Sequence, residues 1–214
     1  INRALAGRDA PIAALIAETG GQNALIADSS ALPEQLVKDA LASAFDSAGQ
    51  RCSAARILLV QADIADRVTT MLAGAMAQLQ VGDPGLLSTD VGPVIDEDAR
   101  AMLETHAARM DGQARLIHAV DLPPETAHGC FVAPRAWLIP SLDLLEREVF
   151  GPMLHVLPYK ARELDAVIDR LNGLGYGLTL GVHSRIDGTV ERIVGRVRAG
   201  NCYVNRNQIG AVVG

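Results

Sequence analysis

The chain has 214 residues, of which 49% are hydrophobic and only 3% aromatic, and its formal net charge is −6. This length is sufficient for one sizeable domain with pieces of a second, and the composition requires a mainly aliphatic core. No block of Lys and Arg is present, which argues against a nucleic-acid-binding surface because phosphate recognition needs clustered cations. No apolar run reaches the roughly 18 residues of a transmembrane segment, and the first residues do not resemble a signal peptide.

The three cysteines are an odd number and lack the close spacing of a metal site. A reducing, cytoplasmic setting without a metal is therefore the simpler interpretation. The chain starts without Met, inside a predicted helix, and stops within an apolar stretch. We therefore expect it to be a fragment of a larger polypeptide.

Hydrophobic periodicity predicts short apolar strands that alternate with amphipathic helices. After the end of a helix at residues 1–7, apolar runs of strand length occur at 12–17, 23–27, 56–60, 114–118, 130–132, 136–139, 154–157, 178–183 and 200–204. Helices are predicted over 32–45, 63–80, 96–110, 162–172 and 187–197, with N-caps at Ser29 or Ser30, at Asp96 and at Asp187. Residues 119–128 are expected to form a loop. This alternation predicts an α/β fold, a three-layer α/β/α arrangement with a mostly parallel sheet.

One cysteine lies in a short polar loop within the stretch from Phe45 to Ala54. Gly49 is expected to end the preceding helix in a left-handed conformation. Cys52 follows Arg51, and a cationic neighbour in a loop favours the thiolate form that makes a cysteine nucleophilic. Cys202, by contrast, lies in an apolar run that is typical of packing. Local chemistry alone supports a nucleophile and an inert thiol about equally at Cys52.

Three sequence motifs, taken together in their order along the chain, favour the nucleophile over the inert thiol at Cys52. They are Ala-Glu-Thr-Gly-Gly at 17–21, Gly-Gln-Arg-Cys at 49–52 and Arg-Glu-Val-Phe-Gly-Pro at 147–152. Their order and spacing resemble the signature motifs of the aldehyde dehydrogenase superfamily, although Thr19 stands where that family usually has leucine. The resemblance covers essentially the whole chain.

The resemblance implies a role for each motif. Cys52 would be the nucleophile, with its backbone N–H as one oxyanion donor, and Glu18 would be the general base that activates water. Glu148 would bind hydroxyl groups of the nicotinamide ribose of NAD, and Phe150 would pack near the nicotinamide. The family's second oxyanion donor, an asparagine, would lie upstream of Ile1. No G-x-G-x-x-G fingerprint follows a strand, so a complete dinucleotide-binding half of the usual kind is not expected here.

Longer runs narrow the resemblance to the L-glutamate γ-semialdehyde (1-pyrroline-5-carboxylate) dehydrogenase branch, and most closely to the dehydrogenase half of the bacterial proline utilization A family. These runs lie at 16–24, 44–54, 203–207 and 210–214. The branch implies that Ser53, Gly210 and Ala211 hold the α-carboxylate of the substrate, since a hydroxyl and consecutive backbone N–H groups can form an anion-binding nest.

The same resemblance implies a domain division. Residues 1–20 would be the end of the coenzyme-binding domain, and residues 21–214 a catalytic domain truncated at its C-terminal end. The cofactor would be NAD, with FAD only in a separate proline dehydrogenase domain of the parent, and the parent would be a homo-oligomer. Because the coenzyme fold and one oxyanion donor are missing, we expect the isolated chain to have little or no dehydrogenase activity.

Alternatives remain open at this point. One is a dehydrogenase for another semialdehyde, which Ser53 and the Gly210–Ala211 pair argue against. A second is a cysteine hydrolase that does not use NAD and pairs Cys52 with a histidine base, for which the candidates are His106, His118, His128, His155 and His183. A third is a non-catalytic folding or assembly unit.

Overall fold

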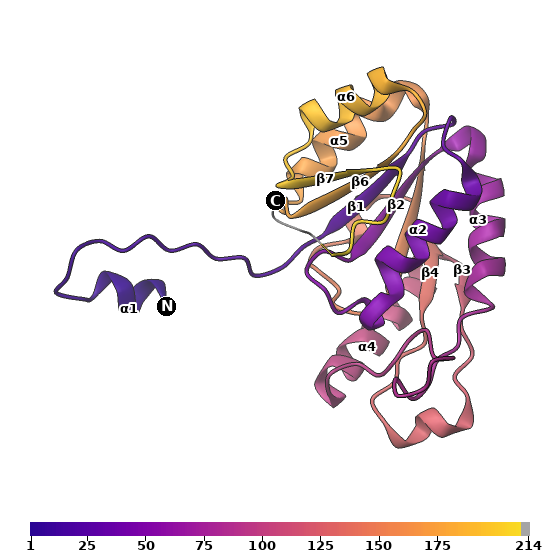
Figure 1. Cartoon of the computed structure of the whole chain (residues 1–214), viewed down its shortest axis with the longest axis horizontal. Coiled ribbons are helices and arrows are strands. Elements are labelled where there is room, and N and C mark those ends of the chain that lie inside the picture. The colour runs from indigo at the N-terminus through magenta and orange to yellow at the C-terminus, as the bar shows by residue number, and fades with distance from the viewer. Residues whose placement is uncertain (211–214) are drawn as a thin grey trace.

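A seven-stranded sheet forms the centre of the computed structural model, which describes residues 1–210 (Figure 1). Across the sheet the strands are β3 (Arg115–Ala119), β4 (Arg135–Leu138), β5 (Met153–Tyr159), β2 (Ala55–Gln61), β1 (Asn23–Ala27), β6 (Thr179–His183) and β7 (Asn201–Val204). Within the described residues, neighbouring strands are parallel except for β3 and β4, which are antiparallel. The predicted mostly parallel sheet is confirmed.

Helices cover both faces of this sheet. They are α2 (Pro33–Phe45), α3 (Ala62–Met76), α4 (Glu97–Gln113), α5 (Leu164–Gly173) and α6 (Asp187–Arg196), whereas α1 (Asn2–Ala6) lies in the N-terminal arm, away from the sheet (Figure 1). The β1-α2-β2 and β6-α6-β7 crossovers run in opposite directions across the sheet, so right-handed connections place α2 and α6 on opposite faces. Helix α3 packs beside α2, and α5 lies beside α6 (Figure 1), joined to it by the Arg192–Asp165 ion pair. The three-layer arrangement is therefore as predicted.

The central strands explain the hydrophobic pattern of the sequence. Every residue of β1 and of β2 is buried, as expected for parallel strands that helices cover on both faces. The core is aliphatic apart from a few large side chains such as Trp137 and Phe45. One long charged side chain interrupts it, because Arg56 in β2 is only 1% exposed.

Two predicted strands are absent from the structure. Residues 12–17 lie outside the sheet in the extended N-terminal arm (Figure 1), where the side chains of Ile12 and Ile16 are exposed. Residues 130–132 also form no strand. A strand needs a neighbour to satisfy its backbone hydrogen bonds, and within residues 1–210 neither segment is paired with another strand.

The helix boundaries correct several predictions. Helix α2 begins at Pro33 after Leu32, without a side-chain cap, because proline suits the first helical position and Ser30 instead donates to Asp28. Asp187 is the first residue of α6 and not its cap. The prediction for Asp96 is confirmed, since its side chain accepts a hydrogen bond from the backbone N–H of Ala99 at 2.8 Å.

Further differences are local. Helix α2 ends before Asp46, so Gly49 is not its C-cap, although Gly49 does adopt a left-handed conformation with φ of 64°. Helix α3 ends at Met76 and not at residue 80. The predicted loop at 119–128 contains a 3₁₀ turn at Pro124–His128, and other 3₁₀ turns span Asp46–Gly49, Leu142–Leu144 and Ala161–Glu163.

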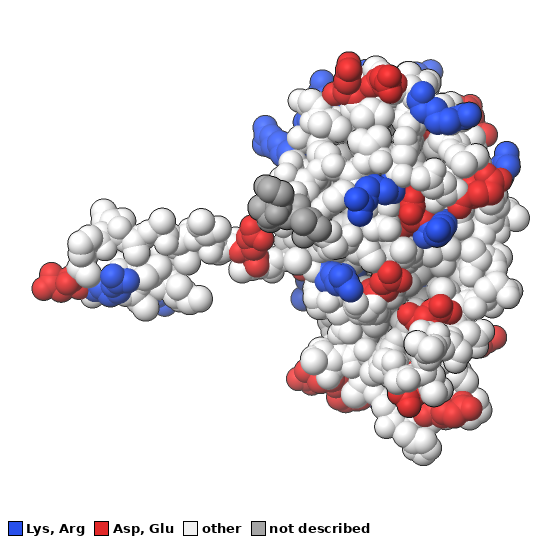
Figure 2. Space-filling model, in the orientation of Figure 1, with Lys and Arg blue, Asp and Glu red and all other residues white. Residues whose placement is uncertain are grey.

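The surface carries mixed charge. On the face drawn in Figure 2, Lys and Arg side chains are scattered among Asp and Glu and form no continuous basic patch. No helix in residues 1–210 combines the length and apolar character that a membrane crossing requires.

Candidate active site

The candidate site lies at the amino-terminal ends of the parallel strands. Residues 20–22 precede β1, residues 50–54 precede β2, residues 148–152 precede β5 and residues 177–178 precede β6. Because β5, β2, β1 and β6 are neighbours in that order, these four segments meet at one edge of the sheet. Ligands of open α/β sheets usually bind at the opposite, carboxyl-terminal edge.

Cys52 is exposed in the segment of residues 50–54, which we call the Cys52 loop. Each carbonyl oxygen of the loop from residue 51 to residue 54 accepts a hydrogen bond from a side chain that projects from the sheet or its edge. Arg56 donates to the oxygen of Arg51 at 3.1 Å, and Asn23 donates to those of Cys52 at 2.6 Å and Ala54 at 2.9 Å. These bonds fix the orientation of the peptide groups around the exposed thiol.

The remaining carbonyl oxygen, that of Ser53, accepts hydrogen bonds from Thr179 at 3.2 Å and from Gln208 at 3.4 Å. The backbone N–H groups of Arg51, Cys52 and Ser53, in contrast, find no acceptor among the described residues. The carbonyls are held by their own donors, and the unused N–H groups beside the thiol provide donors for an oxyanion. Ser53 itself is buried.

The chain enters the Cys52 loop through a strained turn. Ser47, Ala48 and Gly49 have φ values of 56°, 52° and 64° in succession, and such left-handed backbone is unfavourable for residues with a Cβ. At Gly49 an added Cβ would collide with the backbone of Gly151, so only glycine allows this close approach. The turn therefore brings the Cys52 loop against the segment that carries Glu148.

Glu148 is a largely buried carboxylate, with 15% of its side chain exposed. One oxygen, Oε1, is 3.7 Å from Nη2 of Arg56 and has no hydrogen-bond partner among the described residues. Its neighbour Phe150 is partly exposed, with Cζ of Arg56 5.4 Å from the ring centroid. A partly exposed carboxylate next to an accessible aromatic ring fits the ribose hydroxyls and the flat ring of a nicotinamide nucleoside.

The two glycines of the first motif lie between these groups. A Cβ added to Gly20 would be 2.5 Å from Oε2 of Glu148, and one added to Gly21 would collide with the carbonyl oxygen of Cys52. The Gly-Gly pair therefore allows the chain to pass close to the carboxylate of Glu148 and to the carbonyl oxygen of Cys52. Glu18, two residues earlier, has an exposed side chain that makes no hydrogen bond or ion pair within the described part of the chain.

The predicted substrate-binding residues are only partly described. Gly210 is exposed in a left-handed conformation, with open space where a Cβ would lie. Ala211 lies outside the described residues. The structure thus joins Cys52, Ser53, Glu148 and the Gly20–Gly21 pair through direct contacts, whereas no described contact joins Glu18 or Gly210 to them.

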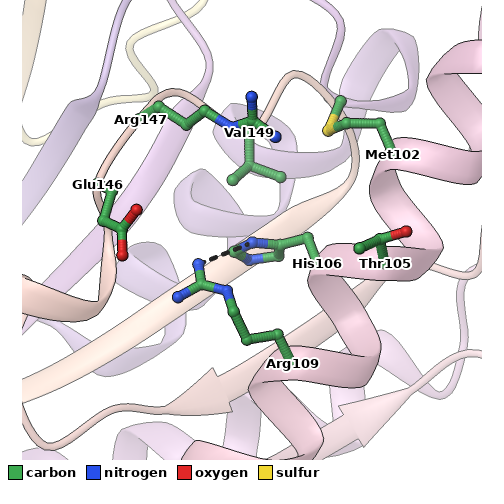
Figure 3. A pocket seen from close by; sticks show the side chains of 7 residues that line it. All are labelled: Met102, Thr105, His106, Arg109, Glu146, Arg147 and Val149. Carbon is green, nitrogen blue, oxygen red and sulfur yellow. Dashed lines mark hydrogen bonds between the residues drawn. The ribbon is translucent and has the colours of Figure 1, made fainter.

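A large cavity lies away from Cys52. It has a volume of about 560 Å³ and is lined by side chains of α4 and of the chain before β5, which are Met102, Thr105, His106, Arg109, Glu146, Arg147 and Val149 (Figure 3). Arg147 and Val149 flank Glu148 in the sequence, but Glu148 is not part of the lining. The cavity contains none of the predicted site residues.

His106 links this cavity to a buried chain of hydrogen bonds. Its Nε2 is 2.9 Å from Nε2 of His155, whose Nδ1 is 2.9 Å from the carbonyl oxygen of Arg56. A carbonyl can only accept, so His155 Nδ1 carries a proton, and His106 donates through Nε2. His106 Nδ1 then accepts from Arg109 at 3.4 Å.

Both imidazoles are neutral at neutral pH. Burial, followed by Arg109 and Arg147, lowers the pKa of His106 from 6.5 to about 4. Burial, followed by His106, lowers the pKa of His155 to about 3. No histidine among the described residues is hydrogen-bonded to Cys52, so the hydrolase alternative finds no base in place.

Four residues around the Cys52 loop were missed from the sequence: Asn23, Arg56, Thr179 and Gln208. Three of them share a signal, since Asn23, Arg56 and Thr179 are polar residues at the start of apolar strands. A polar side chain at such a position is suited to bind the backbone of an adjacent loop. Gln208, fully buried in irregular chain, carries no such signal.

An exposed thiol beside unused N–H groups is suited to covalent chemistry at a carbonyl carbon. The model of the aldehyde dehydrogenase family matches residues 1–214, and the chain belongs to this family. It is 54% identical over 213 residues to the bifunctional protein PutA of Klebsiella aerogenes. This alignment covers 97% of the chain and 16% of that protein. It is 33% identical to the 1-pyrroline-5-carboxylate dehydrogenase of Geobacillus kaustophilus, over 94% of the chain and 38% of that protein.

Solved structures agree with these similarities. The chain superposes on a crystal structure of a proline utilization A variant from Bradyrhizobium japonicum with a TM-score of 0.94 at 56% identity. The match covers 100% of the chain and 22% of that structure. The chain thus spans about a fifth of that protein.

Proposed function

We propose that the chain is the catalytic part of a longer polypeptide that oxidises L-glutamate γ-semialdehyde to L-glutamate with NAD, in the breakdown of proline. Ring opening of 1-pyrroline-5-carboxylate supplies this aldehyde. The similarity to PutA proteins and to a 1-pyrroline-5-carboxylate dehydrogenase supports the substrate. The small share of each relative that the chain covers supports the longer polypeptide.

Cys52 acts as the nucleophile in this scheme. Its thiolate sulfur adds to the aldehyde carbon and forms a thiohemiacetal, and the carbonyl oxygen becomes an oxyanion. The N–H of Cys52 donates to this oxygen, because the loop carbonyls already point to their own donors and leave this N–H unused.

Glu148 and Phe150 would hold the nicotinamide nucleoside, through the carboxylate and the accessible ring. NAD would supply the hydride acceptor for the former aldehyde carbon, which would leave a thioester on Cys52. Glu18 then takes a proton from water, the resulting hydroxide attacks the thioester carbon, and the C–S bond breaks to release the acid and restore Cys52.

Selection of the substrate depends on its α-carboxylate. Ser53 and the backbone at Gly210 and Ala211 form the anion nest that accepts it. In the longer polypeptide, residues 1–20 end the coenzyme-binding domain and residues 21–214 belong to the catalytic domain. The polypeptide is cytoplasmic and homo-oligomeric, and FAD belongs only to a separate proline dehydrogenase domain.

The hydrogen bonds that hold the carbonyls of residues 51–54 carry this proposal, since they leave the Cys52 thiol exposed and the N–H groups of residues 51–53 free. The test is NADH formation by the longer polypeptide with L-glutamate γ-semialdehyde. Activity that is lost in Cys52→Ala and kept in Cys130→Ala, a control at a half-buried cysteine, would support it. A folded wild-type polypeptide that forms no NADH would reject the substrate.

A further inference from the structure

We infer that Arg56 is a positioning residue that ties the cofactor carboxylate Glu148 to the Cys52 loop, so that both halves of the site keep one geometry. This role rests on the proposed function, because it requires Glu148 to bind the cofactor and Cys52 to react. Arg56 is the second residue of β2, four positions after Cys52.

The guanidinium of Arg56 reaches two separate segments, the Cys52 loop and residues 148–151. Nη2 donates to the carbonyl oxygen of Arg51 at 3.1 Å and lies 3.7 Å from Oε1 of Glu148. Nη1 donates to the carbonyl oxygen of Gly151 at 3.1 Å. The same group stacks near the ring of Phe150, with Cζ 5.4 Å from its centroid. One side chain thus contacts the residue before Cys52 and the chain on both sides of Phe150.

The positive charge of Arg56 requires a carboxylate beside it. Burial lowers its pKa to about 10, opposed first by Glu148, so the group stays cationic at neutral pH. A buried cation is costly unless a carboxylate compensates it, and Glu148 is the carboxylate in ion-pair range among the described residues. The attraction holds Glu148 near Arg56, with its buried Oε1 toward the guanidinium and without a hydrogen-bond partner among the described residues.

Only an arginine supplies this set of contacts. Two separate nitrogens donate to two carbonyl oxygens on different segments while the planar group faces an aromatic ring. A lysine ammonium is a single point charge and cannot bridge both carbonyls in the same way. Exchange of Arg56 for lysine should therefore keep the charge but lose the bridge.

The backbone of Arg56 is held as well. Its carbonyl oxygen accepts the Nδ1 hydrogen of His155, which is fully buried and bonded in turn to His106. Arg56 is consequently fixed at both ends, by the histidine pair at the main chain and by two segments, residue 51 and residues 148–151, at the guanidinium. A residue held in this way can transmit the position of one segment to another.

The experiment compares Arg56→Met and Arg56→Lys in the longer polypeptide, with Arg67→Met as the control. Arg67 also pairs with a glutamate, Glu34, at 3.0 Å, but on the surface. We expect both Arg56 variants to bind NADH about tenfold more weakly or worse, because both lose hydrogen bonds made by a charged group. Arg67→Met should leave NADH binding unchanged.

A double-mutant cycle with Glu148→Gln separates positioning from general stability. If Arg56 acts through Glu148, Arg56→Lys weakens NADH binding much less in the Glu148→Gln background than in wild type. Equal fold-losses in both backgrounds would overturn the role of Arg56, as would unchanged NADH binding in both Arg56 variants. Wild-type polypeptide that binds no NADH would instead refute the proposed function itself. Circular dichroism identifies folded variants, and Arg56→Lys keeps the test available if Arg56→Met does not fold.

Discussion

The side-chain amide of Asn23 donates to the carbonyl oxygen of Cys52 at 2.6 Å. The same nitrogen donates to Ala54 at 2.9 Å, and the amide oxygen accepts from the backbone N–H of Thr179 at 3.1 Å. The carbonyls of Cys52 and Ala54 need a donor, and the N–H of Thr179 needs an acceptor. The amide nitrogen of Asn23 must therefore face the two carbonyls, and its amide oxygen must face Thr179. One buried side chain therefore joins the start of β1, the Cys52 loop and the start of β6.

Replacement of Asn23 by Asp is expected to lower the free energy of unfolding by about 2–4 kcal/mol, because a buried carboxylate would face two carbonyl oxygens without a donor. Urea unfolding of the chain measures this change. Asn172→Asp is the matched control, since Asn172 makes the same kind of donor and acceptor bonds at the exposed carbonyl of Arg196 and N–H of Arg198. A loss at Asn23 no larger than that at Asn172 would contradict the expectation.

Gly21→Ala should disrupt the site by collision. The new Cβ would meet the carbonyl oxygen of Cys52 and the side chain of Asn23, and neither can move without breaking their mutual hydrogen bond. We expect a loss of stability of about 1–3 kcal/mol in urea unfolding. Gly74→Ala serves as the control, because nothing lies within 4 Å of its Cβ position in α3, where alanine should stabilise by about 0.5–1 kcal/mol. Equal effects at the two glycines would refute the close approach.

Much of the fold could be predicted because buried parallel strands have a simple pattern. The continuous apolar runs at 23–27 and 56–60 correspond to β1 and β2, the most enclosed strands. The run at 12–17 has the same composition but forms no strand. Composition records only that a segment can be buried, whereas a strand also needs a neighbour that supplies hydrogen bonds.

The site could be predicted only in part, for a different reason. Cys52 and Glu148 belong to recognisable motifs, but the contacts that position their segments are long-range: Asn23 binds the carbonyl of Cys52 across 29 positions of sequence, and Arg56 binds the carbonyl of Gly151 across 95. The rule that ligands bind at carboxyl ends of parallel strands would also have pointed to the wrong edge. Only the three-dimensional order of β5, β2, β1 and β6 brings these segments together.

Acidification should weaken the fold through the histidine pair. Burial lowers the pKa of His106 to about 4 and that of His155 to about 3. Below about pH 6.5 the unfolded chain binds protons that the native chain excludes, so the free energy of unfolding falls as pH falls, by up to ~1.4 kcal/mol per pH unit for each histidine. The decline stops once the native histidines are protonated.

Urea unfolding at several pH values between 7 and 5 tests this dependence. We expect a shallower decline in His155→Gln than in wild type, and an unchanged decline in His128→Gln, which alters an exposed histidine. The same slope in all three proteins would show that the buried pair does not control the acid response.

The three cysteines should differ in reactivity. Cys52 is exposed, whereas Cys130 and Cys202 are half-buried, and burial raises the pKa of Cys202. Because the thiolate is the reactive form, limiting iodoacetamide should label Cys52 first. Peptide mass spectrometry of the labelled chain locates the modification, and preferential labelling of Cys202 would contradict the exposure seen at Cys52.

Covalent catalysis at Cys52 is tested most directly by trapping the thioester. In the longer polypeptide, Glu18→Gln should still form the intermediate but hydrolyse it slowly, since the proposed base is absent. After incubation with L-glutamate γ-semialdehyde and NAD, mass spectrometry should find a glutamyl group on the peptide that contains Cys52. An unmodified Cys52 peptide together with normal turnover, or the adduct on Cys130 or Cys202, would contradict the proposed mechanism.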